Sequence, residues 1–406
     1  MNILLLNHYA GSPKMGMEFR PYYMAREWVK MGHNVKIVAG DFSHLRMKNH
    51  KTEKDFEKTE IDSIDYHWIR TGDYQGNGVR RAFTMFRFVG KLWLKATWIA
   101  KEWKPDVVIA SSTYPLETYA AQRIAKKSQA KLIHEVHDMW PSTLYEVGGM
   151  SRNNPFVVLM QFAENSAYRK SDYIVSLLPH SKEYMMKHGM QGNKFIHIPN
   201  GVVMEEWDNP EALPEKHVKQ FEEIQNKHSF IVGYFGGHAI SNALDTLLDV
   251  AKQTENKDIG YILVGNGIEK ERLMKRQQEE KINNLYFLPS VPKKAVPSLL
   301  KEFDCVYMGG QESPLYRFGL CLNKMFDSMM GGKPIVLAFT TPETIIEQNR
   351  CGVKVNSGDI KAIIDSIEQI KGLPVEERLK MGERGQTSTK NEYSYERLAA
   401  KFAALF

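Results

Sequence analysis

The feature that most constrains the fold is a repeated alternation of short apolar runs with longer helical patterns. In the first half of the chain, the expected strands are 2–6, 35–39, 107–110, 131–135 and 173–177, and the expected helices are 20–31, 116–127 and 156–169. Strands that alternate with helices at this spacing indicate a doubly wound, largely parallel sheet.

The same alternation starts again after Gly201. The expected strands are 230–234, 261–264, 285–287, 305–308 and 334–337, and the expected helices are 243–252, 269–277 and 323–330. A length of 406 residues suits two domains of about 200 residues each. We therefore expect an α/β chain with two tandem Rossmann-like domains and a cleft between them, at 1–200 and 201–385.

The terminal segment 386–406 is expected to form a helix, with an amphipathic pattern from Glu392 to Phe406. We expect this helix to return to the first domain, and the alternative is that it closes the second. The segment from His197 to Val202 contains Pro199 and Gly201 and is the expected hinge between the domains.

The composition is 43% hydrophobic and 25% charged, as in globular proteins. Met1–Leu6 is a short apolar run without a preceding basic region, and no uncharged apolar stretch reaches about 18 residues, so neither a signal peptide nor a membrane span is expected. The three cysteines are too scattered for a disulfide framework or a metal site. We expect a cytoplasmic protein that can also lie peripherally at the inner face of the membrane.

The net charge of +6 is unevenly distributed. Residues 1–200 hold 28 Lys and Arg against 19 Asp and Glu, whereas the remainder has a net charge of −3. This asymmetry indicates that the first half meets an anion, which leaves a diphosphate, an acidic membrane or nucleic acid open.

Residues 79–104 concentrate this charge, with seven cations, one acid and three tryptophans. Arg87, Lys91 and Lys95 are four residues apart and therefore share one helical face. Basic helices of this kind bind anionic membrane surfaces, although a domain helix with its apolar side in the core is the alternative. Nucleic acid is not expected as a partner, because the aromatic residues are spaced for packing rather than for stacking on bases.

Two glycine loops are candidate phosphate sites. Gly11–Glu18, which contains Gly16, follows the first strand, and Gly233–His238, which contains Gly236 and Gly237, follows the first strand of the second half. Ligands bind at the carboxyl ends of such strands, and helix amino termini favour anions. The alternative for each loop is an ordinary turn.

A third candidate is the pair His137 and Asp138 at the end of a strand. Strand alternation places Glu135 and His137 on one face and His134 on the other, which argues against a shared metal site. A His-Asp pair at this edge suits orientation of a substrate hydroxyl or of a leaving phosphate, and the alternative is a capped strand end.

The segment 314–334 carries the most specific pattern. Asn323-Lys324, Asp327 and the turn Gly331-Gly-Lys-Pro334 resemble the donor-binding helix of retaining family-4 glycosyltransferases of the GT-B fold. The further matches are Arg20–Trp28, Gly32–Val35, His137-Asp138, Ile198–Val202, Gly236-Gly237 and Leu263–Gly267. Among members of that family, the chain is most similar to bacterial transferases of surface polysaccharides, such as amino-sugar transferases of O-antigen and capsule assembly.

The resemblance implies transfer of a sugar, with retention, from a UDP-sugar to a glycan or polyprenyl-diphosphate-linked acceptor. It implies that Asp327 holds the ribose, that His137 and Asp138 face the transferred sugar, and that Gly16 approaches the phosphates. The family's first acid is missing, because Gly319 stands eight residues before Asp327, and no cation follows Gly237. The diphosphate is then expected to fall to Lys324, Arg317 and the amides of Gly236 and Gly237, with Asn323 beside them.

No Asp-x-Asp sequence and no cluster of metal ligands is present, so neither a metal nor a cofactor beyond the nucleotide-sugar substrate is expected. Two other functions stay open. One is a UDP-sugar 2-epimerase of the same fold, and the other is a non-catalytic protein that binds nucleotide sugars, which the missing acid favours.

Overall fold

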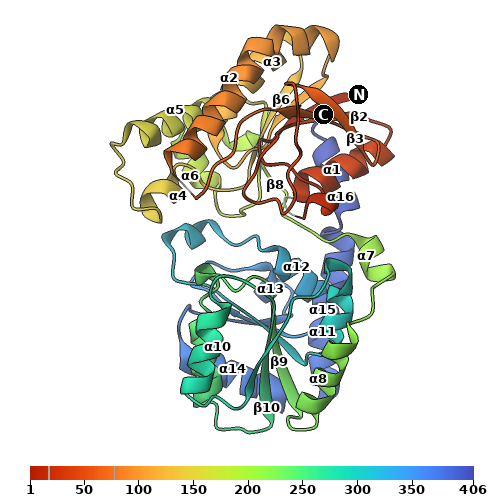
Figure 1. Cartoon of the computed structure of the whole chain (residues 1–406), viewed down its shortest axis with the longest axis vertical. Helices are drawn as coiled ribbons and strands as arrows, with labels where there is room; N and C mark the ends of the chain where they lie inside the picture. The colour runs from red at the N-terminus through yellow and green to blue at the C-terminus, as the bar shows by residue number, and fades with distance from the viewer. Residues whose placement is uncertain (17–18, 77) are drawn as a thin grey trace. The chain divides into compact units, whose positions relative to one another are not determined.

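A computed structural model describes residues 1–16, 19–76 and 78–406 of the chain. They form two compact units, coloured along the chain in Figure 1. The first unit contains Met1–Pro199 together with Tyr395–Phe406, and the second contains Asn200–Ser394. The sequence analysis placed the return to the first domain at residue 386, but one helix continues without interruption to Glu392, so residues 386–394 stay in the second unit.

The first unit is built on a sheet in the order β3-β4-β2-β1-β5-β6-β7-β8. Its strands are β1 (Asn2–Leu6), β2 (Asn34–Gly40), β3 (Glu57–Ile61), β4 (Ile64–Ile69), β5 (Val107–Ala110), β6 (Lys131–Val136), β7 (Tyr173–Ser176) and β8 (Phe195–His197). Neighbouring strands pair in parallel except β3 and β4. Central β1 is almost wholly apolar because both of its faces are covered, whereas edge strand β3 is charged and half exposed.

The helices of the first unit cover both faces of this sheet. They are α1 (Phe19–Lys30), α2 (Val79–Glu102), α3 (Thr118–Ser128), α4 (Ser142–Glu146), α5 (Pro155–Lys170), α6 (Lys182–Lys187) and α16 (Tyr395–Ala403), with the short 3₁₀ turns η1 (Pro13–Met15), η2 (Pro115–Glu117) and η3 (Gly192–Lys194). Terminal helix α16 packs on α1, where Trp28 donates its indole N–H to the carbonyl of Ala399 at 3.1 Å and lies 5.1 Å from the ring of Phe402.

The second unit has a fully parallel sheet in the order β11-β10-β9-β12-β13-β14. Its strands are β9 (Phe230–Phe235), β10 (Ile259–Val264), β11 (Leu285–Leu288), β12 (Cys305–Gly309), β13 (Ile335–Ala338) and β14 (Gly352–Val355). The strand order reverses between β9 and β12, and such a switch point is where doubly wound sheets form a ligand-binding crevice at their carboxyl edge.

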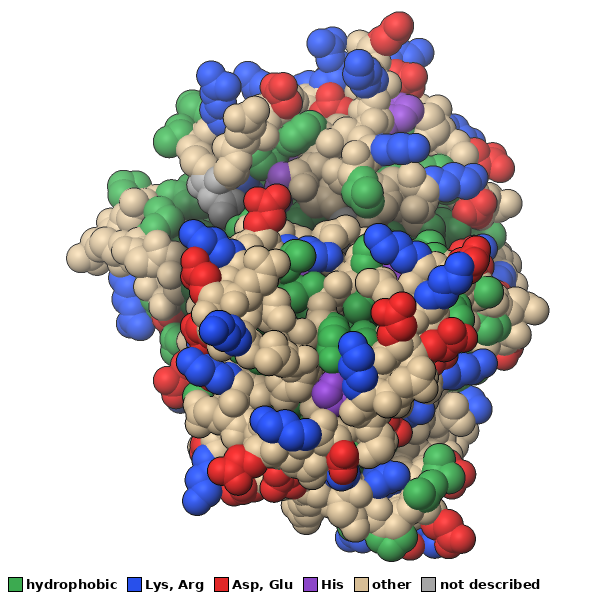
Figure 2. Space-filling model, turned by 60° about the horizontal axis from the view of Figure 1, so that its bottom comes forward, with side chains coloured by type: hydrophobic (Ala, Val, Ile, Leu, Met, Phe, Trp, Pro, Cys, Tyr) green, Lys and Arg blue, Asp and Glu red, His purple; other side chains and the backbone are tan. Residues whose placement is uncertain are grey.

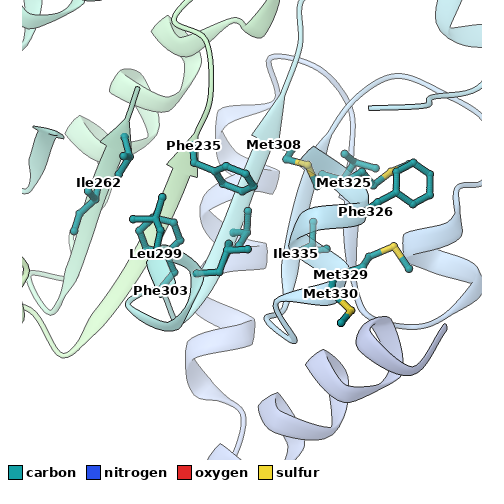
Figure 3. Close-up of a cluster of buried hydrophobic side chains, with 14 of the residues drawn as sticks. Phe235, Ile262, Leu299, Phe303, Met308, Met325, Phe326, Met329, Met330 and Ile335 are labelled. Carbon is teal, nitrogen blue, oxygen red and sulfur yellow. The ribbon is translucent and has the colours of Figure 1, made fainter. Parts of the chain in front are cut away.

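Helices also cover both faces of the second sheet. They are α7 (Met204–Asp208), α8 (Glu215–Gln225), α9 (Leu244–Gln253), α10 (Lys270–Glu279), α11 (Val296–Lys301), α12 (Asn323–Met330), α13 (Ile345–Gln348), α14 (Ile360–Gly372) and α15 (Val375–Glu392), with η4 (Ile240–Asn242), η5 (Lys293–Ala295) and η6 (Pro314–Phe318). Figure 3 shows how Met325, Phe326, Met329 and Met330 of α12 join a buried apolar cluster with side chains of the sheet. This packing fixes α12, and with it the side chains that α12 presents at the carboxyl edge.

The surface carries both signs of charge, and on the face drawn in Figure 2 the Lys and Arg side chains intermingle with Asp and Glu. Within the described ranges, no helix combines the length and the apolar character that crossing a membrane requires.

Candidate functional site

One candidate site lies in the second unit, at the carboxyl edge of its sheet and at the switch point between β9 and β12. The loop after β9 runs through Gly236 and Gly237 into η4. The loop after β12 contacts it, because Gln311 donates its backbone N–H to the carbonyl of Ser241 at 3.2 Å. This is the location that the glycine pattern predicted.

Lys324, in the first turn of α12, reaches this loop. Its ammonium donates to the hydroxyl of Tyr234 and to Oδ1 of Asn242, each at 3.1 Å, and lies 4.4 Å from the centre of the Tyr234 ring. Tyr234 and Asn242 in turn donate to the carbonyl of Gly237, at 2.7 and 2.9 Å. The cluster therefore combines one cation with a glycine loop.

The charge of Lys324 has no negative partner among the residues that the structure describes. Burial lowers the pKa of Lys324 to about 8, because the ammonium is poorly solvated. A buried cation without a counter-charge is costly, and such groups gather at functional sites. The amino terminus of α12 adds to this field, since its first turn has no acid and its preceding residue no side-chain cap. An anion would complete the cluster.

Gly236 is required by the backbone conformation of this loop. It adopts φ 126°, a conformation that L side chains rarely take, and the ammonium of Lys324 lies within van der Waals reach of its Cα face. The neighbouring strand end packs more tightly, since a Cβ on Gly265 would lie 1.9 Å from the carbonyl oxygen of Gly236. The backbone of this loop is thus open to a close ligand in the way that phosphate loops require.

Asp327 lies one turn further along α12 and is buried. Lys293 of η5 donates to both of its carboxylate oxygens, at 3.3 and 3.2 Å, and lies 3.8 Å from Glu206. The expected ribose-binding acid is therefore held by a cation that sequence reasoning did not identify.

The remaining predicted donor residues occupy different positions. Asn323 begins α12 and is exposed. Arg317 is also exposed and is engaged within its own turn, where it donates to the carbonyl of Pro314 at 2.6 Å and stacks over Phe318. Gly319, at the position of the family's missing first acid, has φ 93°, so an acidic residue there would be strained.

A separate cluster of candidate residues lies in the first unit, at the carboxyl end of β6. His137 Nε2 is 3.0 Å from Oε2 of Glu135 and 3.0 Å from Oγ of Ser111, so Glu135 and His137 do share a face, as strand alternation predicted. Arg20 of α1 donates from Nε and Nη2 to Oε1 of Glu135, at 3.0 and 2.9 Å. Burial alone would raise the pKa of Glu135, but the charge of Arg20 and the hydrogen bonds from His137 and Ser111 outweigh it and hold that pKa well below its usual range.

Asp138 does not join this network. Its carboxylate accepts from the backbone N–H of Met139 at 2.8 Å and from the hydroxyl of Thr143 at 2.9 Å, so it caps the turn that leads into α4. Burial raises the pKa of Asp138. The structure thus separates the two members of the predicted pair, since only His137 contacts Glu135.

Gly16 ends η1 with φ 91° and donates its N–H to the carbonyl of Ser12 at 3.1 Å. A Cβ at Gly16 would lie 2.8 Å from the side chain of Met47. Met17 and Glu18, which close the predicted glycine loop, lie outside the described residues. In the rest of the chain, no three His, Cys, Asp or Glu side chains gather in a way that could hold a metal ion.

Comparison with known proteins assigns each half of the chain to a glycosyltransferase family model. Residues 15–206 match Glycosyltransferase Family 4, and residues 215–388 match Glycosyl transferases group 1. WcaI of Escherichia coli (strain K12), whose name assigns it to colanic acid biosynthesis as a glycosyl transferase, is 23% identical over 208 residues, which are 50% of this chain and 51% of WcaI. The matched region thus spans about half the length of that relative.

Solved structures match over the whole chain at low identity. HepE of Anabaena, in complex with UDP, has a TM-score of 0.70 and 16% identity, with 100% of this chain and 99% of that chain covered. Sucrose-phosphate synthase of Thermosynechococcus elongatus has a TM-score of 0.72 and 14% identity, with 99% and 97% covered. The two-sheet architecture and the consecutive family matches agree, and the chain belongs to the family-4 glycosyltransferases of the GT-B fold.

Proposed function

We propose that the chain transfers a glycosyl group from a UDP-sugar to a glycan or polyprenyl-diphosphate-linked acceptor in surface-polysaccharide synthesis. The observation that carries the proposal is Lys324, a buried ammonium beside the Gly236-Gly237 loop with neutral partners only. The UDP bound to HepE and the name of WcaI support the nucleotide and the pathway class.

In this proposal the second unit binds the donor. Lys324 and the Gly236-Gly237 loop neutralise the diphosphate, and Asp327 accepts the ribose hydroxyls while Lys293 holds it in place. The bond between the anomeric carbon and the β-phosphate oxygen breaks, and UDP leaves with both bonding electrons. The acceptor hydroxyl forms the new bond with retained configuration, and its proton passes to the released UDP. Protein cations and amides stabilise the charge that develops on the leaving diphosphate.

The first unit then binds the acceptor, with His137 near the transferred sugar and Gly16 near the phosphates. This assignment rests on the family resemblance and on the place of His137 at the carboxyl end of β6. The structure gives Asp138 a capping contact, which supports a role in shaping the loop around His137.

The test is a thermal-shift comparison of UDP-, GDP-, dTDP- and ADP-sugars, followed by transfer assays with the stabilising donor, because ligand stabilisation scales with affinity. We expect UDP-sugars to stabilise the protein and transfer to continue in EDTA. Stabilisation by none of the donors would contradict the donor site. Interconversion of UDP-sugars without an acceptor would favour the epimerase instead.

A polyprenyl-linked acceptor is anchored in a membrane, so the proposed enzyme would act at a membrane surface. Helix α2 has an exposed apolar face that could bind such a surface. Its large apolar side chains that face solvent are Val79 (72% exposed), Phe83 (58%), Phe86 (42%), Trp93 (42%), Leu94 (80%) and Trp98 (40%). They recur at helical spacing, and we name them the α2 stripe. An amphipathic helix with Trp, Phe and Leu on one side inserts at the boundary between headgroups and acyl chains.

The basic residues expected to face the membrane are partly used inside the protein. Lys91 is paired with Asp55 at 2.8 Å and also donates to the carbonyl of Arg70, and Arg87 donates to the carbonyl of Thr71 at 3.1 Å. We therefore propose that apolar insertion of the α2 stripe, rather than Arg87, Lys91 and Lys95, supplies most of the attachment.

Liposome co-sedimentation tests this attachment. We expect the double variant Leu94→Glu/Trp98→Glu to lose binding to anionic vesicles, whereas Val375→Glu/Leu379→Glu, which alters two equally exposed apolar residues of α15, keeps it. Equal loss in both double variants, or binding that disappears in Arg87→Glu/Lys91→Glu/Lys95→Glu alone, would overturn the role of the stripe.

A further inference from the structure

Both hydrogen-bonding contacts of the His137 ring lie at one nitrogen. Nε2 is 3.0 Å from Oε2 of Glu135 and from Oγ of Ser111, whereas Nδ1 has no hydrogen-bond partner among the described residues. The side chain of His137 is 14% exposed, so the ring reaches the surface at the carboxyl end of β6. A nucleophile–base–acid triad needs both ring nitrogens, so Ser111 is not an activated nucleophile here.

The positions of the protons follow from the neighbouring groups. Glu135 is ionised, because the guanidinium of Arg20 holds its pKa well below the usual range, and a carboxylate only accepts hydrogen bonds. Ser111 has one hydroxyl proton, and the 2.6 Å contact of its Oγ with Oε2 of Glu135 uses that proton. The proton that Nε2 shares with these two oxygens must therefore be its own, and a ring with a single proton then carries Nδ1 as an acceptor.

Arg20 keeps this arrangement in place. It holds Oε1 of Glu135 through two donors, and it also donates to the carbonyls of Ile198 and Pro199, the last two residues of the first unit before the second begins. Arg20, Glu135 and Ser111 are at most 5% exposed, so neither water nor rotation readily relaxes their contacts.

We propose that Arg20, Glu135 and Ser111 are positioning residues that fix His137 as the Nε2–H tautomer and present Nδ1 as an acceptor to a hydroxyl of a bound sugar. The part about the sugar rests on the proposed transferase function. An unprotonated Nδ1 accepts a hydrogen bond from the hydroxyl of the sugar and so fixes the orientation of that hydroxyl. In the opposite tautomer, Nδ1 carries a proton and cannot accept this hydrogen bond. The carboxylate thus acts through His137 and does not touch substrate.

The ring ¹⁵N spectrum of histidine-labelled protein at about pH 8, above the ordinary imidazole pKa, tests the tautomer directly. The signals of His137 are assigned by their absence in His137→Gln. We expect a protonated Nε2 and an unprotonated Nδ1 in the wild type, and a mixed or reversed pattern in Glu135→Gln. A protonated Nδ1 in the wild type overturns the proposal, and this spectrum decides it even if Glu135→Gln fails to fold.

Kinetics supply the second readout. Glu135→Gln should lower kcat by about tenfold, the scale of one mismatched hydrogen bond of about 1.4 kcal/mol to the transferred sugar, and leave the dissociation constant of UDP unchanged. The matched control is Glu164→Gln, which removes another buried carboxylate of the first unit whose partners are Tyr168, Tyr184 and Gln161. Equal losses of kcat in the two variants would reduce Glu135 to a structural role. Because the spectrum needs no substrate, absence of transfer in the wild type would count against the proposed function and not against the tautomer.

Discussion

Glu135 in the first unit and Lys324 in the second are both buried charges at the carboxyl edge of a parallel sheet, but their charges are matched differently. Glu135 has the guanidinium of Arg20, the hydroxyl of Ser111 and His137 as partners. Lys324 has a phenol and an amide oxygen, and its charge is unmatched by any carboxylate in the described chain.

This difference distinguishes residues that maintain the structure of a site from residues that bind a ligand. A buried ion completed by its own protein is stable without any ligand, and loss of one partner leaves the other ion uncompensated. A buried ion with neutral partners costs stability until a counter-charge arrives, so its removal should matter for binding rather than for folding. Substitutions with opposite expected effects on the two clusters therefore test this comparison.

The largest effect is expected for Arg20→Met. It leaves the Glu135 carboxylate buried without its cation, which should cost about 3–5 kcal/mol of unfolding free energy. Urea unfolding of the wild type and the variant measures this loss. The control is Lys30→Met on the same helix, where the pair with Glu27 involves a lysine whose side chain is 50% exposed, and a change below about 1 kcal/mol is expected.

The double variant Arg20→Met/Glu135→Gln removes the uncompensated charge and should recover part of the loss. If Arg20→Met is no less stable than Lys30→Met, the first cluster is not a matched ion pair, and the contrast with Lys324 fails.

Lys324→Met has the second largest expected effect. Unlike Arg20→Met, it should not lower the free energy of unfolding. It removes a poorly solvated ammonium, so the unfolding free energy should stay the same or rise. Loss of charge-assisted hydrogen bonds of about 1.5–3 kcal/mol should weaken UDP binding by about ten- to hundredfold. Calorimetric titration with UDP and urea unfolding measure both quantities on one protein. A destabilised variant with unchanged UDP affinity would show that Lys324 only holds the loop.

Much of the fold could be predicted from the sequence, because local apolar runs mark the buried strands. The expected strands at 2–6 and 107–110 and the expected helix at 323–330 agree with β1, β5 and α12. The hairpin of β3 and β4 was missed, because the charged pattern of an edge strand resembles that of a loop. The end of the second domain was placed too early, because α15 is largely polar and gives no clear apolar period.

The candidate site was predictable where its signal is local. The glycine loop follows from its short motif, Lys324 and Asp327 follow from the resemblance of their segment to a known family, and the face shared by Glu135 and His137 follows from strand alternation. The partners that determine the charge and orientation of these side chains lie far away in the sequence. Arg20 is separated from Glu135 by 115 residues, and Tyr234 is separated from Lys324 by 90 residues. Only the tertiary fold brings such pairs together, so sequence spacing contained no signal for them.

Asp327 resembles Glu135 in having an opposite charge as its partner, Lys293, and resembles Lys324 in being proposed to bind the ligand. The variant Asp327→Asn tests this group. Loss of the negative charge should weaken UDP binding by about tenfold through the ribose hydroxyls. The variant should fold, because Lys293 is partly exposed and keeps Glu206 nearby. Uridine monophosphate, which keeps the ribose and lacks the β-phosphate, should lose affinity equally. An unchanged affinity for both ligands would remove Asp327 from the donor site.

The smallest effect is expected from pH alone, and it tests the unmatched charge without any substitution. Because burial places the pKa of Lys324 at about 8, the charged fraction of this lysine falls as the pH rises through that value. UDP prefers the charged form, so, measured above about pH 7 where the terminal phosphate of UDP is ionised, its dissociation constant should rise by up to about tenfold per pH unit above about 8. The nearby His238 stays neutral, since burial and the charges of Lys270 and Lys324 lower its pKa to about 4, and burial raises the pKa of Tyr234.

Lys324→Arg keeps its charge throughout and should give a flat profile. A wild-type profile as flat as that of Lys324→Arg would mean that the ammonium of Lys324 does not meet the diphosphate.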